Sequence, residues 1–171
     1  VEEWTRRACE TIKEVTGQEA TCAAAPGWRT NDAVLQAREP FGFQFASDCR
    51  GESVFRPELG GDLLSTPQIP ATLPTFDEII GQGGVTVVNY NQHLLDLVRP
   101  GKLNVLTIHA EVEGIAYLPH FEEFLRLAAK RDFRLLPLGQ LLPDKIEPGR
   151  VVPEVIPGRE GWVACQACPS A

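Results

Sequence analysis

One histidine of this sequence, His109, stands between an apolar segment and two carboxylates. The segment 103–108 is largely apolar, and Glu111 and Glu113 follow the histidine at alternate positions. An imidazole titrates near neutral pH and can donate or accept a proton in a reaction. The stretch therefore predicts acid–base chemistry at the carboxyl end of a strand, which is where substrates bind in parallel α/β proteins.

Polar side chains also follow two earlier segments that resemble strands. Arg29 comes after a short apolar run, and Asp48 and Arg50 come after a run of alternating phenylalanines. If the strands are parallel, these groups share one edge of the sheet with His109. A carboxylate beside an imidazole orients the ring and raises its pKa, so Asp48 and His109 are the expected catalytic pair.

Structural roles for the same residues remain open alternatives. A histidine at a strand end can be a core residue, an aspartate can form a turn, and an arginine can lie on the surface. Glu111 and Glu113 would point to opposite sides of an extended segment, so at most one should face the site. We expect His93, within a helix, and His120, in the first turn of another, to be structural or solvated.

The five cysteines are an odd number scattered along the chain, which is typical of free thiols in a reducing compartment. Cys165 and Cys168 have the spacing of a metal knuckle or a redox pair. They lack the second Cys or His pair that structural zinc needs, and we expect them to lie in an inert polar tail.

The alternation of helical and strand-like patterns predicts an α/β protein with a parallel sheet, either open or closed into a barrel. The expected helices are 2–16, a helix capped by residues 30–32 and running through Arg38, 76–81, 89–99, one from Pro119 onward, and a turn at 139–142. The expected strands are 20–25, 41–45, 68–73, 103–108 and 133–136. We expect a long loop at 51–67, a linker at 81–84 and coil from Pro143 onward. The segment Gly158–Trp162 could either close over a ligand or pack the tail.

The composition argues against nucleic acid as a partner and against a membrane-spanning helix. The net charge is −7 and no basic run exceeds two residues, so the electrostatic driving force of nucleic-acid binding is missing. No apolar stretch approaches the roughly 20 residues of a membrane-spanning helix. The sequence contains no methionine and opens with a helical pattern where an α/β unit would open with a strand. We therefore expect it to be part of a longer protein.

Five segments, taken together, carry a more specific signal. They are TCAAAPGWR at 21–29, SDCRG at 47–51, QIPATLPT at 68–75, TIHAEVEG at 107–114 and GREGW at 158–162. In order and spacing they resemble the undecaprenyl-phosphate 4-deoxy-4-formamido-L-arabinose deformylases, which are members of the NodB-like polysaccharide deacetylase superfamily. The resemblance covers nearly the whole chain.

The resemblance implies that residues 1–171 are a single partial domain, the C-terminal portion of a distorted (β/α) barrel with a tail of mostly coil at 143–171. It also implies a divalent metal held by an Asp and two His of N-terminal motifs, with a further N-terminal Asp as base. Neither motif occurs in this sequence. We therefore expect no metal ligands here, and an inactive chain when it stands alone.

The resemblance also implies roles for individual residues. Arg29 matches the arginine that orients the catalytic base. Asp48 matches the acid that pairs with the catalytic histidine, and His109 matches that histidine, the proton donor to the leaving amine. Arg50, Glu111 and Glu113 lie in matching motifs, and binding of the sugar or its phosphate is their expected role.

The implied reaction is metal-dependent hydrolysis of the formamide on an undecaprenyl-phosphate-linked amino sugar. It would give formate and a free amine for lipid A modification and polymyxin resistance. The expected location is peripheral, on the cytoplasmic side of the bacterial inner membrane. Two alternatives remain open: a related amino-sugar N-deacetylase, and a noncatalytic carbohydrate-binding or scaffold protein. The sequence leaves the oligomeric state open.

Overall fold

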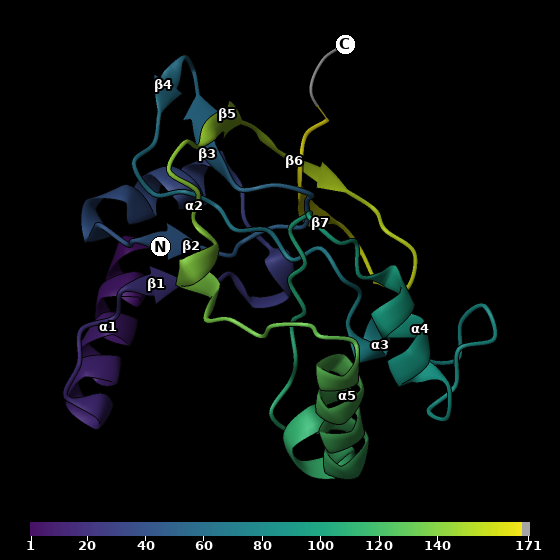
Figure 1. Ribbon diagram of the computed structural model, residues 1–171. Coiled ribbons are helices and arrows are strands. Elements are labelled where there is room, and N and C mark those ends of the chain that lie inside the picture. The colour runs from purple at the N-terminus through teal and green to yellow at the C-terminus, as the bar shows by residue number, and fades with distance from the viewer. Residues whose placement is uncertain (169–171) are drawn as a thin grey trace.

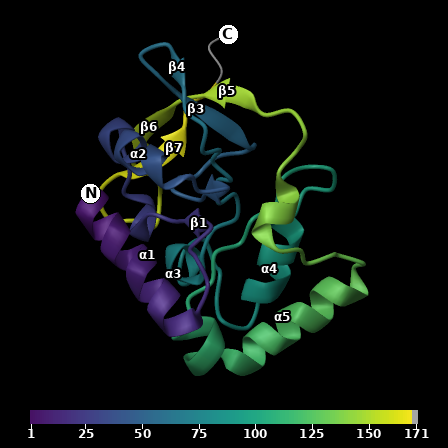
Figure 2. The same cartoon turned by 90° about the vertical axis from the view of Figure 1, so that its left-hand side faces the viewer.

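The computed structural model describes residues 1–168 and shows a mixed α/β fold with three small sheets (Figures 1 and 2). The helices are α1 Glu2–Thr16, α2 Asp32–Arg38, α3 Phe76–Ile79, α4 Tyr90–Leu97 and α5 Leu118–Lys130. The strands are β1 Cys22–Ala23, β2 Phe45–Ala46, β3 Phe55–Leu59, β4 Asp62–Leu63, β5 Glu147–Gly149, β6 Val151–Glu154 and β7 Val163–Gln166. Short turns of helix lie at η1 Pro26–Trp28, η2 Glu39–Phe41, η3 Val112–Ala116 and η4 Leu138–Leu141. The predicted α/β class is confirmed.

The predicted helices are present, and their ends follow from the residues there. α1 stops at Gly17, which adopts a left-handed conformation with φ 72°. α2 begins after Asn31, whose side-chain oxygen accepts the backbone N–H of Val34 at 3.1 Å. Pro119 lies in the first turn of α5, where its missing N–H costs nothing.

Parallel pairing brings the ends of the early strands to one edge, as the sequence predicts. β1 and β2 pair in parallel, with Cys22 opposite Phe45. The segment 68–71 extends this arrangement through parallel bridges from Gln68 to Ala46 and from Ala71 to Arg50. The loops after β1 and β2 therefore leave the same edge of the sheet. The strand predicted at 41–45 is shorter because Gly42, at φ 63°, ends a turn first.

The prediction of a strand at 103–108 is wrong. Val105 is buried, and the N–H groups of Thr72 and Leu73 both donate to its carbonyl oxygen, at 3.1 and 3.0 Å. Its own N–H donates to the hydroxyl of Thr72 at 2.8 Å. In a β ladder the N–H of Val105 would donate to a backbone carbonyl, whereas here it donates to a side chain. The segment is therefore held at Val105 without forming a strand.

Three further predictions about strands and coil are also wrong. No strand is present at 133–136, where residues 134–136 are exposed. The expected loop at 51–67 contains the antiparallel pair β3 and β4, and the expected coil after Pro143 contains β5, β6 and β7. Proline hid several of these strands, because Pro57, Pro148 and Pro153 lie within β3, β5 and β6. Short strands with free N–H positions tolerate proline, although its presence argues against a strand in a sequence.

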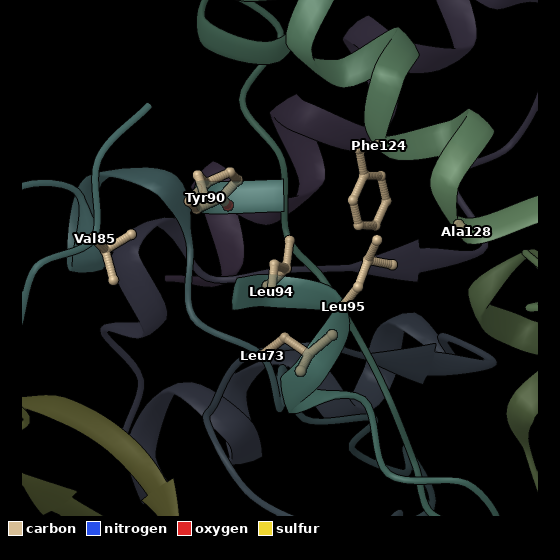
Figure 3. Close-up of a cluster of buried hydrophobic side chains, with 7 residues drawn as sticks. All are labelled: Leu73, Val85, Tyr90, Leu94, Leu95, Phe124 and Ala128. Carbon is tan, nitrogen blue, oxygen red and sulfur yellow. The ribbon is translucent and has the colours of Figure 1, made fainter. Parts of the chain in front are cut away.

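The largest buried cluster lies between α4 and α5 (Figure 3). Its members are Leu73, Val85, Tyr90, Leu94, Leu95, Phe124 and Ala128. Leu94 and Leu95 are each 1% exposed and point from α4 toward the neighbouring elements. Burial of these apolar side chains fixes α4 and α5 against the segment that leads to His109.

α1 lies at the edge of the molecule and buries none of its residues (Figures 1 and 2). Trp4 and Val15, on its predicted apolar face, are 71% and 79% exposed. The amphipathic pattern thus predicts the helix correctly, but no other part of residues 1–168 buries its apolar face.

Truncation of Leu94 tests the core. Leu94→Ala should lower the free energy of unfolding by roughly 2–5 kcal/mol, because a fully buried leucine leaves a cavity. Val88→Ala, at a position that is 94% exposed, should change it by less than about 0.5 kcal/mol. Urea denaturation followed by circular dichroism measures both. Equal effects of the two substitutions would contradict the core described here.

Candidate functional site

A large cavity of about 1050 Å³ opens among the strand ends and the helices α4 and α5. Most of its wall is apolar and includes Leu95, Phe121 and Phe124. Trp28 of the loop after β1, Ser47 after β2 and His109 also line it, as does Arg159 of the C-terminal segment. Residues from four distant parts of the sequence therefore meet around one space.

The backbone of His109 is held on both sides. Its carbonyl oxygen accepts the N–H groups of Val112 and Glu113 at 3.0 and 2.9 Å. Its N–H donates to Oε2 of Glu113 at 2.7 Å. The carboxylate thus closes the turn onto the histidine, and a charge-assisted bond of this length is among the stronger ones in proteins. This arrangement fixes the backbone from which the imidazole projects at the cavity.

Glu113 is buried, at 6% exposure, rather than presented to the cavity. Its second oxygen, Oε1, and the hydroxyl of Tyr90 have no hydrogen-bond partner among residues 1–168. Both residues line the same small cavity of about 20 Å³. Burial, followed by the nearby charge of Glu113, raises the pKa of Tyr90, so its hydroxyl stays protonated and available as a donor. The geometry supports a positioning role for Glu113, and its contact with substrate stays a prediction.

Glu111 lies differently from its predicted extended geometry. Residues 112–116 form a turn of π-helix, and Glu111 is the residue that precedes it. Its side chain is exposed, and its backbone carbonyl accepts the N–H of Ala116 at 3.1 Å. Glu113 is therefore buried and Glu111 is exposed to solvent, as the prediction of opposite sides requires. The segment is helical, however, and not extended as predicted. Substrate binding by Glu111 stays a prediction.

A buried indole organises the cations beside His109. Trp28 is 6% exposed, and the guanidinium groups of Arg50 and Arg159 each lie 4.8 Å from its ring centroid. Its backbone has φ 54°, a left-handed conformation that is rare for a large side chain. Strain of this kind persists only where surrounding contacts hold it, here the two stacked cations.

Glu78 of α3 is the anion of this cluster. It is 4% exposed, and Nη1 of Arg50 donates to both of its oxygens at 3.0 and 3.2 Å. The N–H of Thr75 donates to Oε2 at 2.9 Å, and Nη1 of Arg159 reaches Oε1 at 3.4 Å. Arg50, predicted to bind the sugar or its phosphate, is thus committed to a carboxylate and an indole and does not line the large cavity in the described part of the chain.

The segment 158–162 packs over this cluster. Gly158 has φ 85°, and a Cβ there would clash with the backbone carbonyl of Glu78. Nη2 of Arg29 donates to the carbonyl oxygen of Glu160 at 2.6 Å, and its guanidinium lies 5.3 Å from the ring centroid of Trp162. Arg159 of this segment lines the cavity, and closure over a ligand stays a prediction.

The predicted contact between Asp48 and His109 is not formed. Asp48 is 1% exposed, and its carboxylate accepts Nη1 of Arg38 at 2.8 Å and Nε2 of Gln68 at 3.1 Å. Successive residues of an extended chain point to opposite sides, so Ser47 lines the cavity while Asp48 points toward α2. The alternation that identifies the strand also places this carboxylate on the other face.

The sequence reasoning missed Trp28, Glu78 and Arg159 as parts of the site. Trp28 and Arg159 lie in two of the five segments that carry the family resemblance. Each is part of the site through contacts with residues that are distant in the sequence. A local signal for Glu78 does exist, because Thr75 and Glu78 have the spacing of a capping box, which the structure contains. That signal predicts a helix start and says nothing about the two arginines that Glu78 binds.

No three His, Cys, Asp or Glu side chains within residues 1–168 lie close enough together to hold a metal ion. All five cysteines are free. Cys165 is not in a coil tail: it lies in β7 and is buried, whereas Cys168 is exposed. Burial raises the pKa of the Cys165 thiol, which opposes the thiolate form that metal binding or redox exchange requires.

Comparison with curated proteins confirms the resemblance. The chain is 44% identical over 160 residues to the "Probable 4-deoxy-4-formamido-L-arabinose-phosphoundecaprenol deformylase ArnD" of Shewanella sediminis (strain HAW-EB3), a match that covers 91% of this chain and 51% of that protein. It is 41% identical over 160 residues to the protein of the same name from Wigglesworthia glossinidia brevipalpis, covering 91% of this chain and 56% of that protein.

The chain spans about half the length of these relatives. No protein-family model matches it. Among the helices described for residues 1–168, none is both long and apolar enough to cross a bilayer.

Amide exchange tests the anchoring of His109. Glu113→Ala removes the acceptor of the His109 N–H, so hydrogen–deuterium exchange at that amide should accelerate by roughly tenfold or more. Glu111→Ala, which removes an exposed carboxylate two positions away, should leave it unchanged. Exchange at His109 that is equally fast in wild type and in Glu113→Ala would show that the carboxylate does not hold the turn.

Alkylation tests the state of the cysteines. Burial raises the pKa of Cys49, which is 0% exposed, and of Cys165, so both should be protonated and shielded near neutral pH. Iodoacetamide should label the exposed Cys22 and Cys168 at least about tenfold faster in the folded protein, as measured by peptide mass spectrometry. Rapid labelling of Cys165 would instead indicate an activated thiol.

Proposed function

We propose that the protein carrying this chain removes the formyl group from a 4-deoxy-4-formamido-L-arabinose linked to undecaprenyl phosphate. The observation that carries the proposal is the homology, at 41–44% identity over 91% of the chain, to proteins named as deformylases of this substrate. The arrangement of His109, Ser47 and Arg159 around one cavity supports it. The products would be formate and a sugar with a free amine, for the modification of lipid A.

In this reaction His109 serves as the general acid. Water adds to the formyl carbon, the C–N bond breaks, and the departing nitrogen must gain a proton to leave as an amine. The imidazole lies at the cavity, and its backbone is fixed by Glu113. A positioned imidazolium can supply that proton, a contribution of about a hundredfold to ten-thousandfold in rate.

The divalent metal that the resemblance implies finds no ligand set in residues 1–168. We therefore propose that its ligands, and the base that activates water, come from outside the described residues. What this chain supplies is one wall of the site, with the acid and the cations.

Two observations support the proposal that the chain is the C-terminal portion of a (β/α) barrel. The apolar face of α1 is exposed, and Ile108, Leu135 and Leu136, which line the large cavity, are 45%, 63% and 40% exposed. Both are surfaces that a further set of strands and helices would bury. Residues 1–171 would then be a single partial domain.

The substrate would place the protein at a membrane surface, since the sugar is attached to a lipid. We propose a peripheral position on the cytoplasmic side of the bacterial inner membrane. The modified lipid A would carry an additional amine, and its positive charge would weaken the binding of cationic peptides such as polymyxin.

Replacement of His109 tests the proposal in the complete protein. His109→Ala should lower kcat for the formamido sugar by roughly a hundredfold or more, with KM little changed, because the lost group acts on the leaving nitrogen. His93→Ala is the matched control, since His93 lies on α4 and lines neither cavity described above. Near-wild-type turnover by His109→Ala would remove this residue from the mechanism.

The same assay should include the corresponding acetamido sugar. Faster release of acetate than of formate by the wild-type protein would overturn the deformylase proposal in favour of an N-deacetylase.

A further inference from the structure

We propose that Arg159 forms a binding subsite for the phosphate group of the lipid-linked sugar. This inference rests on the proposed function, because it names the part of that substrate which the subsite would bind. It replaces Arg50, the arginine that the sequence suggested for the same task.

Position is the first argument. Arg159 and Arg134 line the large cavity together with His109 and Ser47, whereas Arg50 and Arg29 do not line it in the described part of the chain. Arg134 is exposed to solvent, so Arg159 is the partly buried arginine of this wall. The side chain of Arg159 is 19% exposed, so it is largely buried yet reachable from the cavity. A substrate whose amide lies at His109 would therefore have a guanidinium group within the same space.

The commitment of each arginine is the second argument. Arg50 donates to both oxygens of Glu78 at 3.0 and 3.2 Å. Arg159 meets Glu78 and Asp77 only at 3.4 and 3.5 Å, through the single nitrogen Nη1. Its Nη2 and Nε make no hydrogen bond within residues 1–168, so donors remain for a ligand.

Charge is the third argument. Two guanidinium groups, those of Arg50 and Arg159, pair with the carboxylate of Glu78, and Arg159 also lies 3.5 Å from that of Asp77. The side chain of Asp77 is 56% exposed, so solvent screens its charge, whereas that of Glu78 is 3% exposed. The buried part of the cluster thus holds two cations and one anion in a chain whose net charge is −7, which favours an anionic ligand at this place.

Preorganisation is the fourth argument. The guanidinium group of Arg159 is stacked 4.8 Å from the ring centroid of the buried Trp28, and Gly158 fixes the preceding backbone at φ 85°. A cation held in this way loses little conformational freedom when it binds. The planar fork of arginine also matches two phosphate oxygens, which a lysine cannot do.

The test compares two substrates of the complete protein. One is the formamido sugar linked through phosphate to a short prenyl chain, and the other is the methyl glycoside of the same sugar, which has no phosphate. Arg159→Gln should lower kcat/KM for the phosphate-linked substrate by roughly tenfold to a hundredfold, through KM. For the methyl glycoside the change should be at most about twofold, which also shows that the variant is folded.

Two further variants sharpen the comparison. Arg159→Lys keeps the charge but not the fork, and should fall between wild type and Arg159→Gln. Arg150→Gln removes an exposed arginine that does not line the cavity, and should leave both substrates unaffected.

The outcomes separate this inference from the proposed function. An equal loss on both substrates, or no loss on either, would overturn the phosphate subsite while leaving the deformylase intact. Failure of the wild-type protein to release formate from either substrate would overturn the proposed function, and the subsite with it.

Discussion

The hydrogen bond from the His109 N–H to the buried carboxylate of Glu113 is the constraint on which the site depends. The segment that leads to His109 is not a strand and is tied to the core chiefly at Val105. Without a ladder of backbone bonds, the direction of the imidazole must be set by the turn that follows it. Glu113 sets that turn by closing it onto the histidine at 2.7 Å. The nearby protonated Tyr90 and the packing of α4 and α5 keep the carboxylate out of solvent.

A second constraint acts on the part of the cavity wall that Trp28 and Arg159 form. Trp28, Glu78 and Arg159 come from three distant segments and meet through stacking and ion pairing. Trp28 and Glu78 would each be unfavourable without the others, because Trp28 has a left-handed backbone and the carboxylate of Glu78 is buried. Together they compensate one another, since cations cover the ring and neutralise the carboxylate. The wall therefore combines a rigid support with one guanidinium group that is only partly committed.

The sequence predicts the local features of this molecule well and the pairwise ones poorly. The helices follow from apolar periodicity and end signals such as Asn31 and Gly17, which act within a few residues. His109 lies at a cavity shared with the ends of the early strands, but it is held there through Val105 and Glu113 and not by the parallel strand that the sequence predicts. Ser47 and Asp48, in contrast, point to opposite faces, and Asp48 pairs with Arg38. Which of the two faces the cavity depends on which face of the sheet is buried, and the sequence does not show this. The strands around Pro57 and Pro153, like the partners of Arg159, are set by tertiary contacts that no local pattern contains.

The central claim is that the amide nitrogen of a formamido sugar meets the imidazole of His109 in the cavity that Arg159 also lines. A crystal structure of the complete protein with the amino-sugar product bound tests it most directly. The account predicts the product amine within about 3 Å of an imidazole nitrogen of His109, with the glycosidic phosphate on the side of Arg159. A product bound elsewhere, or an imidazole turned away from it into the core, would contradict the account.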